Sequence, residues 1–190
     1  GYLYDGKFLA ALIKDPAMAL KVTHKFNDTN PFPMTAFYGA GGDLNQEVAD
    51  LVAYFKSIAP KEMSDRDVFI ESCARCHDMK YVNVFANGNK QSIANYLGMT
   101  PPDLSMYIRS RSELYLNNFI NDTQKMLPGT SMPRVGLNEQ AQKQVIEYMR
   151  EAGDSKKEER ETTGIYIMIY FAILSVFAWA WKRKIWSKLH

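Results

Sequence analysis

Cysteine and histidine are scarce in this chain of 190 residues, which holds 2 cysteines and 3 histidines. So few thiols and imidazoles leave no second Cys or His pair to complete the four ligands of a structural zinc site. The hydrophobic pattern is helical almost throughout, and without a βαβ pattern the cysteines do not resemble a redox dithiol. The formal net charge is only +2, which argues against nucleic acid as a partner.

Both cysteines lie in one stretch, Cys73–His77, whose sequence is Cys-Ala-Arg-Cys-His. The two thiols are one helical turn apart, a spacing that lets them add to the two vinyl groups of one porphyrin, and the pattern is the attachment signature of haem c. His77 then falls under the iron as its proximal ligand. The sequence therefore predicts one covalent haem on Cys73 and Cys76. A structural or zinc-binding cysteine pair is the alternative.

A methionine is the usual sixth ligand where the potential of a haem must be high. Met132 is the first candidate, because it follows Pro128 and Gly129 in a loop that can place a thioether over the opposite haem face. Met126 competes in the same segment. Since methionine is more often a core residue than a ligand, at most one of the two is expected to bind iron.

Helical patterns lie on both sides of the attachment stretch. Ser64 indicates the start of a helix that carries Phe69, and Asn138 the start of another that carries Tyr148. This order resembles the small class I cytochrome c domain, in which an aromatic of an N-terminal helix crosses an aromatic of a C-terminal helix. The resemblance implies a contact between Phe69 and Tyr148.

The chain contains this pattern about one and a half times. Met34 lies beside two prolines and precedes a Leu-Asn pair and an amphipathic helix, which repeats the later order around Met132. Residues 1–59 therefore resemble the C-terminal part of a second such domain, with Met34 as its axial ligand. The matching attachment motif would precede Gly1, so a second haem is expected in the intact protein. A haem-free helical domain is the alternative. His24 could replace Met34 as a haem ligand, but a lone histidine in a lysine-rich stretch is more often exposed surface.

Between Ile165 and Trp181 no charged residue occurs. This stretch is at the short end of the range that crosses a bilayer as a helix, and Gly164 and Ile185–Trp186 can extend it. The charges in residues 156–161 and 182–184 on its two sides favour a membrane anchor over a buried core helix. The cluster of Lys and Arg after Trp181 places the C-terminus in the cytoplasm. Everything before Gly164 then lies on the periplasmic side of a bacterial inner membrane, where haem c is attached.

The sequence thus predicts an all-α protein with two class I cytochrome c-like helical domains, the first truncated, and one C-terminal transmembrane helix. The expected parts are a partial N-terminal domain (1–59), a complete cytochrome c domain (60–153), a charged linker (154–163), a transmembrane anchor (164–183) and a cytoplasmic tail (184–190).

The segment Pro101–Ser105 reads Pro-Pro-Asp-Leu-Ser and is followed by Arg111. With the attachment motif, the late methionine and the C-terminal anchor, residues 64–190 resemble cytochrome c1, the haem subunit of the cytochrome bc1 complex. With residues 1–59 the chain is similar to the two-haem bacterial type. The resemblance implies that Arg111 pairs with a haem propionate and that the segment around Pro102 packs beside the haem edge. The inserted loops of the mitochondrial type are missing.

What this resemblance implies is a one-electron relay within a quinol:cytochrome c reductase. A Rieske iron-sulfur protein would deliver the electron, cytochrome b would be a neighbour, and a soluble cytochrome c or a terminal oxidase would accept it. A dimeric complex is expected by the same analogy, and no residue of this chain is expected to be catalytic. The alternatives are a two-haem oxidase subunit, a free membrane-anchored electron shuttle, and a haem peroxidase, which would need the sixth position that Met132 closes.

Overall fold

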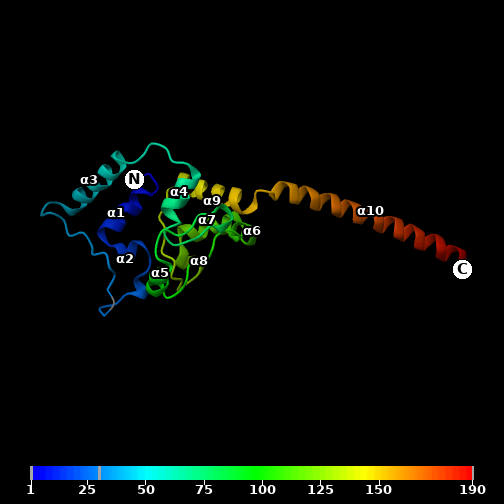
Figure 1. Cartoon of the computed structure of the whole chain (residues 1–190), viewed down its shortest axis with the longest axis horizontal. Coiled ribbons are helices and arrows are strands. Elements are labelled where there is room, and N and C mark those ends of the chain that lie inside the picture. Colours follow the sequence, from blue (N-terminus) through cyan, green and yellow to red (C-terminus); the bar gives the residue numbers. More distant parts are fainter. Residues whose placement is uncertain (1, 30, 190) are drawn as a thin grey trace. The chain divides into compact units, whose positions relative to one another are not determined.

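The computed structural model describes residues 2–29 and 31–189 of the chain. Within them the fold is all-α, as predicted: ten α-helices and two short 3₁₀-helices are joined by loops, and no strand occurs (Figure 1). The α-helices are α1 (Gly6–Lys14), α2 (Pro16–Ala19), α3 (Leu44–Ser57), α4 (Asp65–Ser72), α5 (Lys90–Leu97), α6 (Tyr107–Ser110), α7 (Glu113–Asn121), α8 (Thr123–Met126), α9 (Glu139–Asp154) and α10 (Lys157–Leu189). The 3₁₀-helices are η1 (Thr23–Lys25) and η2 (Lys80–Val82).

Side-chain caps start the two helices that frame the core. The Ser64 hydroxyl accepts a hydrogen bond from the backbone N–H of Asp67 at 3.1 Å and begins α4. The Asn138 side chain accepts from the backbone N–H of Ala141 at 2.8 Å and begins α9. Each cap satisfies an amide that has no partner within the helix, so both predicted helix starts are confirmed.

Helices α4 and α9 cross at the centre of the main core. Phe69 of α4 is fully buried, and its ring centroid lies 5.1 Å from that of Tyr148 with the planes at 45°, which confirms the predicted aromatic contact. Farther along α9, a Cβ on Gly153 would lie 2.4 Å from the carbonyl oxygen of Ser105, so only glycine lets α9 approach the segment before α6 this closely. The crossing therefore fixes the position of Ser105 and its neighbours.

Helices α1 and α2 repeat the pattern of α7 and α8. Each pair consists of a helix of 9 residues and a helix of 4 residues. Asp5 and Ser112 cap the first helix of each pair, and one aspartate, Asp15 or Asp122, ends the first helix and caps the second. The internal repeat thus extends to the helices that precede the two methionine segments.

Helix α3 packs against α1, just as α9 packs against α7. Val48 of α3 is buried, but Tyr54 and Phe55 are exposed by 58% and 38%. Phe55 follows Leu44 at the same interval at which Tyr148 follows Leu137 in the later repeat. The equivalent Tyr148 is covered by α4 and is only 8% exposed.

The chain divides into two compact units, Gly1–Asp154 and Ser155–His190. Residues 1–59 and 60–153, expected from the sequence to be separate domains, belong to the same unit and share contacts along residues 2–25. This joint unit carries all of the candidate site residues.

Helix α10 makes up most of the second unit (orange to red in Figure 1). It begins at Lys157, inside the expected linker 154–163, and runs without interruption through the expected anchor 164–183 to Leu189. Its length and apolar composition allow it to cross a membrane, and within the described residues it is the single such helix. At about 1.5 Å per residue it exceeds the ~30 Å hydrocarbon core, so its charged ends extend beyond the apolar span.

Candidate functional site

Both cysteines and His77 lie in one helical turn that continues from α4. Cys73 is the C-cap of this helix. The backbone N–H groups of Cys76 and His77 both donate to the carbonyl oxygen of Cys73, at 3.1 and 2.9 Å. These two bonds close the turn, and they place two thiols and an imidazole on a single short piece of backbone.

The two thiols are free of a disulfide and protonated near neutral pH. Burial raises the pKa of Cys73 to about 11, although a contact of 3.4 Å with the Ser72 hydroxyl acts in the opposite direction. Burial also raises the pKa of Cys76. A redox dithiol needs a lowered thiol pKa, so the raised pKa of both thiols weighs against that alternative. Among the described residues, no cluster of three or more His, Cys, Asp or Glu that could hold a metal ion is found.

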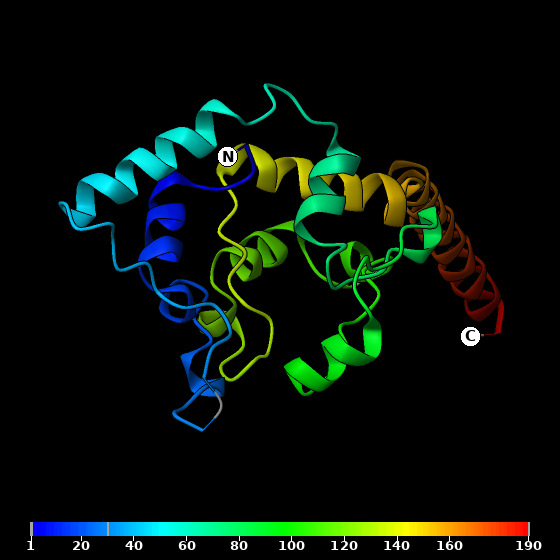
Figure 2. The same ribbon diagram turned by 60° about the vertical axis from the view of Figure 1, so that its left-hand side comes forward.

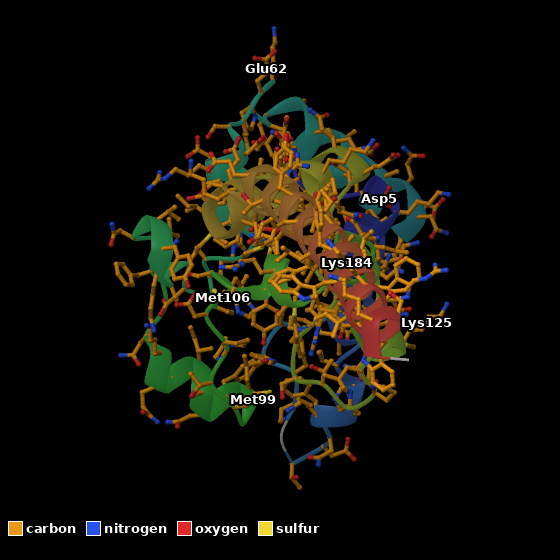
Figure 3. All side chains as sticks on the ribbon, turned by 90° about the vertical axis from the view of Figure 1, so that its right-hand side faces the viewer. Asp5, Glu62, Met99, Met106, Lys125 and Lys184 are labelled. Atoms are coloured by element: carbon orange, nitrogen blue, oxygen red, sulfur yellow. The ribbon has the colours of Figure 1, made fainter. Side chains whose placement is uncertain are left out.

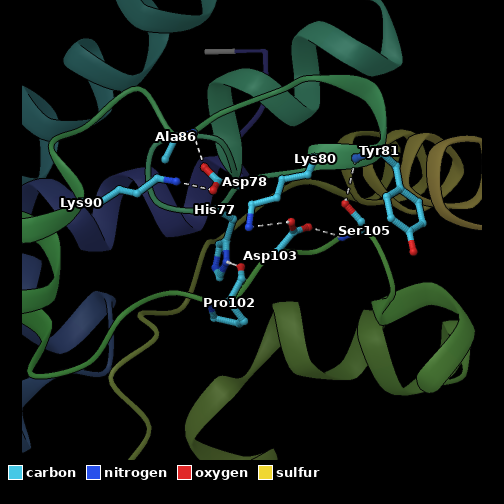
Figure 4. A network of polar contacts seen from close by, with 9 residues as sticks. All are labelled: His77, Asp78, Lys80, Tyr81, Ala86, Lys90, Pro102, Asp103 and Ser105. Atoms are coloured by element: carbon cyan, nitrogen blue, oxygen red, sulfur yellow. Dashed lines mark hydrogen bonds and ion pairs between the residues drawn. The ribbon is translucent and has the colours of Figure 1, made fainter.

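The His77 ring is held in one tautomer. Its Nδ1 donates to the carbonyl oxygen of Pro102 at 2.8 Å (Figure 4). Because a carbonyl can only accept, Nδ1 carries the proton and Nε2 keeps its lone pair. Burial lowers the pKa of His77, partly offset by the bond to Pro102 and by the charge of Asp78, so the ring is neutral at pH 7. A neutral imidazole oriented by a backbone carbonyl is the form in which histidine binds a metal.

The carbonyl of Pro102 is itself fixed, because the segment 101–105 is bonded along its length to residues 78–81 (Figure 4). These contacts are Leu104 N to Asp78 O at 2.9 Å, Tyr81 N to Ser105 Oγ at 3.2 Å, and the ion pair of Lys80 with Asp103 at 3.7 Å. The Pro-Pro-Asp-Leu-Ser segment thus holds the acceptor that orients His77.

Asp78 is a further residue of the site, and the sequence analysis missed it. Its carboxylate is 8% exposed, accepts from the backbone N–H of Ala86 at 2.8 Å and pairs with Lys90 (Figure 4). The hydrogen bond from Lys90 is the largest cause of a lowered pKa for Asp78, so the group is ionised at neutral pH. The one available signal in the sequence was an acidic residue directly after the attachment motif.

Helix α5 connects this turn to the segment of Met132. Lys90, its first residue, pairs with Asp78, and the carbonyl oxygen of Leu97, its last, accepts from the Ser131 hydroxyl at 2.8 Å. The attachment turn and the methionine segment are therefore tied to opposite ends of a helix about 12 Å long. Met132 is half-buried there.

Three other residues predicted for haem binding lie on separate segments of the chain. Arg111 is exposed, and its guanidinium lies 5.6 Å from the ring centroid of Tyr115. Met34 is 49% exposed in the segment between η1 and α3. Met126 is half-buried at the end of α8. Among the described contacts around His77, none involves these three residues, whereas Cys73, Cys76 and Pro102 share the site with it.

Exposed apolar side chains lie in the segments that follow the attachment turn. They are Tyr81, Val82, Phe85, Tyr96, Met99 and Met106. Met99 and Met106, which are labelled in Figure 3, precede and follow the segment Pro101–Ser105 in the sequence. A small hollow beside Cys76 is lined by both ion pairs of the site and by Ile93, Thr100 and Pro101. Two thiols and a neutral imidazole on one turn are the protein groups that hold haem c, so the residues present fit this group.

Comparison with known proteins finds no matching family model and no matching curated protein. Among solved structures, the chain is similar to a chain of one described as "Hyperthermophilic respiratory Complex III", with 20% sequence identity and a TM-score of 0.45. The similarity covers 90% of this chain and 94% of that one. A likeness of this size leaves the function to be argued from the site itself.

Proposed function

We propose that this chain is a membrane-anchored c-type cytochrome that passes single electrons. Cys73 and Cys76 would carry the haem through thioether bonds, and His77 Nε2 and Met132 Sδ would hold the iron. The observation that supports this most directly is the hydrogen bond from His77 Nδ1 to Pro102 O, made by the histidine of the turn that also carries both thiols. When bound, the haem supplies a one-electron iron couple that no side chain of the protein offers.

The residues around this turn act by holding its parts in place. The Pro102 carbonyl keeps the proton of His77 on Nδ1, which leaves Nε2 available. Asp78 bonds the following loop through Ala86, and with Lys90 it anchors the start of α5. A site whose ligands keep their positions in both oxidation states has little to rearrange when an electron arrives or leaves.

A second haem with Met34 as axial ligand belongs to this proposal. It is supported by the repeat of α7 and α8 in α1 and α2, and by the equivalent packing of α3 on α1 and α9 on α7. The exposed side chain of Met34 would then face that second haem.

Helix α10 would be the membrane anchor. Its large apolar side chains are exposed along the span, which is unfavourable in water and favourable in a bilayer. Lys182, Arg183, Lys184 and Lys188 at its C-terminal end favour a cytoplasmic C-terminus. The haem unit would lie on the periplasmic side of a bacterial inner membrane.

Within this class, a subunit of a quinol:cytochrome c reductase is the assignment we favour. The electron would come from a Rieske iron-sulfur protein and leave to a soluble cytochrome c or a terminal oxidase, in a dimeric complex with cytochrome b. The support is the Pro101–Ser105 segment, whose backbone orients His77, and the membrane helix that follows the haem unit. In oxidase subunits of the two-haem type the membrane helix usually precedes the haem domains.

Purification of the full chain in mild detergent, from membranes of its source, tests this assignment. We expect a cytochrome b and a Rieske protein to co-purify, and added quinol to reduce the c-type haem. Co-purification with oxidase subunits, or isolation of the chain alone with haem that quinol does not reduce, would contradict the assignment to a reductase. A chain without covalent haem would contradict the whole proposal.

A further inference from the structure

We propose that residues 2–25, here called the N-terminal clamp, position the methionine loop, residues 127–138, with Phe8 and Arg134 as positioning residues for the axial ligand. The inference rests on the proposed function, in which Met132 of that loop binds the iron. It gives residues 2–25 a role at the haem site of Cys73 and Cys76, separate from the proposed second haem of Met34.

The first part of the clamp pairs with the end of the methionine loop through backbone hydrogen bonds. Asp5 N donates to Gly136 O at 3.1 Å, and Asn138 N donates to Leu3 O at 2.9 Å. Between them Tyr4 and Leu137 form an antiparallel bridge. Figure 2 shows α1 beside this loop. The pairing fixes the register of the loop after Met132.

Phe8 makes the next contact between the clamp and the methionine loop. It is 3% exposed, and a Cβ on Gly136 would lie 2.2 Å from its ring, so the ring lies directly against the loop backbone. Gly136 has a φ of +72°, which a glycine adopts without strain. On the same ring, the guanidinium of Arg134 lies 5.4 Å from the centroid, and Arg134 Nε donates to Asn121 O at 3.0 Å.

The end of the clamp holds the loop close to the methionine. The backbone N–H of Arg134 donates to the carbonyl oxygen of Leu20 at 2.9 Å. Lys25 Nζ donates to Leu97 O at 2.8 Å, the same carbonyl that accepts from the Ser131 hydroxyl. Arg134, just after the Met-Pro dipeptide, is thus bonded to the clamp directly. Ser131, just before the dipeptide, is bonded to a carbonyl that the clamp also bonds.

A thioether is a weak neutral ligand, so the iron keeps it only where the chain holds it in place. If the clamp holds the loop, loosening the clamp should favour an external ligand over Met132. Imidazole is a suitable probe, because it binds ferric haem when the sixth position becomes free. Its affinity therefore reports how firmly the loop is held, independently of electron-transfer activity.

The experiment measures imidazole affinity of the oxidised full-length protein, together with the weak red absorption of the thioether–iron bond. Phe8→Leu keeps most of the volume but removes the ring face, and Arg134→Gln removes the cation above it. Each should raise the affinity about three- to fivefold, the range of one lost cation–π contact. The double variant should exceed Arg134→Gln by little, because Arg134→Gln already removes the cation–π contact with Phe8, together with the Nε hydrogen bond to Asn121 O. Phe55→Leu on α3 is the matched control and should stay within about twofold of wild type.

Met132→Leu separates a failure of the clamp from a failure of the ligand assignment. If it binds imidazole far more tightly than wild type while Phe8→Leu and Arg134→Gln do not, the clamp is overturned and the ligand assignment stands. If Met132→Leu leaves affinity and absorption unchanged, the ligand assignment fails and the clamp fails with it. Should Phe8→Leu not fold, Arg134→Gln decides the question, because its side chain lies in the loop and is half-exposed.

Discussion

Replacement of Asp78 by alanine should destabilise the first compact unit of the chain more than any other change of one charge near the candidate site. Its carboxylate is 8% exposed and accepts from Ala86 N at 2.8 Å while pairing with Lys90. A hydrogen bond to a charged group contributes about 1.5–3 kcal/mol, and a partly exposed ion pair about 0.2–1 kcal/mol. The alanine variant leaves the Ala86 amide without its acceptor, so we expect a loss of about 2–4 kcal/mol.

For a unit of about 150 residues this loss corresponds to a fall of roughly 4–16 °C in Tm. Thermal unfolding followed by far-UV circular dichroism, in a chain truncated after Glu161, measures it. Asp78→Asn keeps an acceptor for the Ala86 amide, so its Tm should fall by less. Lys90→Met removes only the exposed partner of the ion pair, so its Tm should fall least. If Lys90→Met destabilises as much as Asp78→Ala, the buried hydrogen bond is not what matters and the reasoning is refuted.

Three further predictions concern the ligand, the pH dependence and the anchor. Met132→Leu should keep the fold and the covalent haem but lower the reduction potential and remove the thioether–iron absorption. Met126→Leu should leave the potential and the absorption near wild type. The opposite result in a spectroelectrochemical titration would reverse the ligand assignment. The hydrogen bond from Lys21 lowers the pKa of Asp122, so its stabilisation is present above the unfolded pKa of about 3.9 and is lost as pH falls through the folded value. Asp122→Asn should therefore destabilise by at most about 1 kcal/mol at pH 7, and urea unfolding should show this difference vanish in acid; a constant difference argues against the ion pair. Truncation after Glu161 should release a haem-loaded protein from membranes, and a product that stays bound in high salt would reveal another anchor.

Local features of the site were predictable from the sequence because they depend on neighbouring residues. The turn Cys73–His77 follows from bonds between positions three and four apart, and the caps at Ser64 and Asn138 follow from side chains beside the helix start. The contact of Phe69 with Tyr148 required the resemblance to a known domain, since periodicity shows which face is apolar but not which helices meet.

The remaining features depend on contacts between distant segments. Pro102 was expected beside the haem edge, yet the orientation of His77 by its carbonyl follows from backbone bonds between residues 78–81 and 101–105. Asp78 belongs to no periodic pattern in the sequence that would mark it as a residue of the site. The pairing of Arg111 with a haem propionate was expected by resemblance and stays a prediction; the guanidinium of Arg111 lies over the ring of Tyr115.

The expected linker 154–163 is helical from Lys157 for a simple reason. Its charged residues are mostly Glu, Lys and Arg, which are strong helix formers, so a change in polarity along the chain does not end the helix. The composition marks where the apolar span begins, and the helix itself starts earlier.

Covalent haem content is the measurement that tests the account most directly. The chain should be expressed in a bacterium that matures c-type cytochromes, denatured, and examined by intact mass and by the pyridine haemochrome spectrum. We predict one haem per chain that survives denaturation, and none in Cys73→Ala/Cys76→Ala. Haem that dissociates on denaturation, or a chain that carries none, would contradict the assignment of Cys73, Cys76 and His77 as a haem c site.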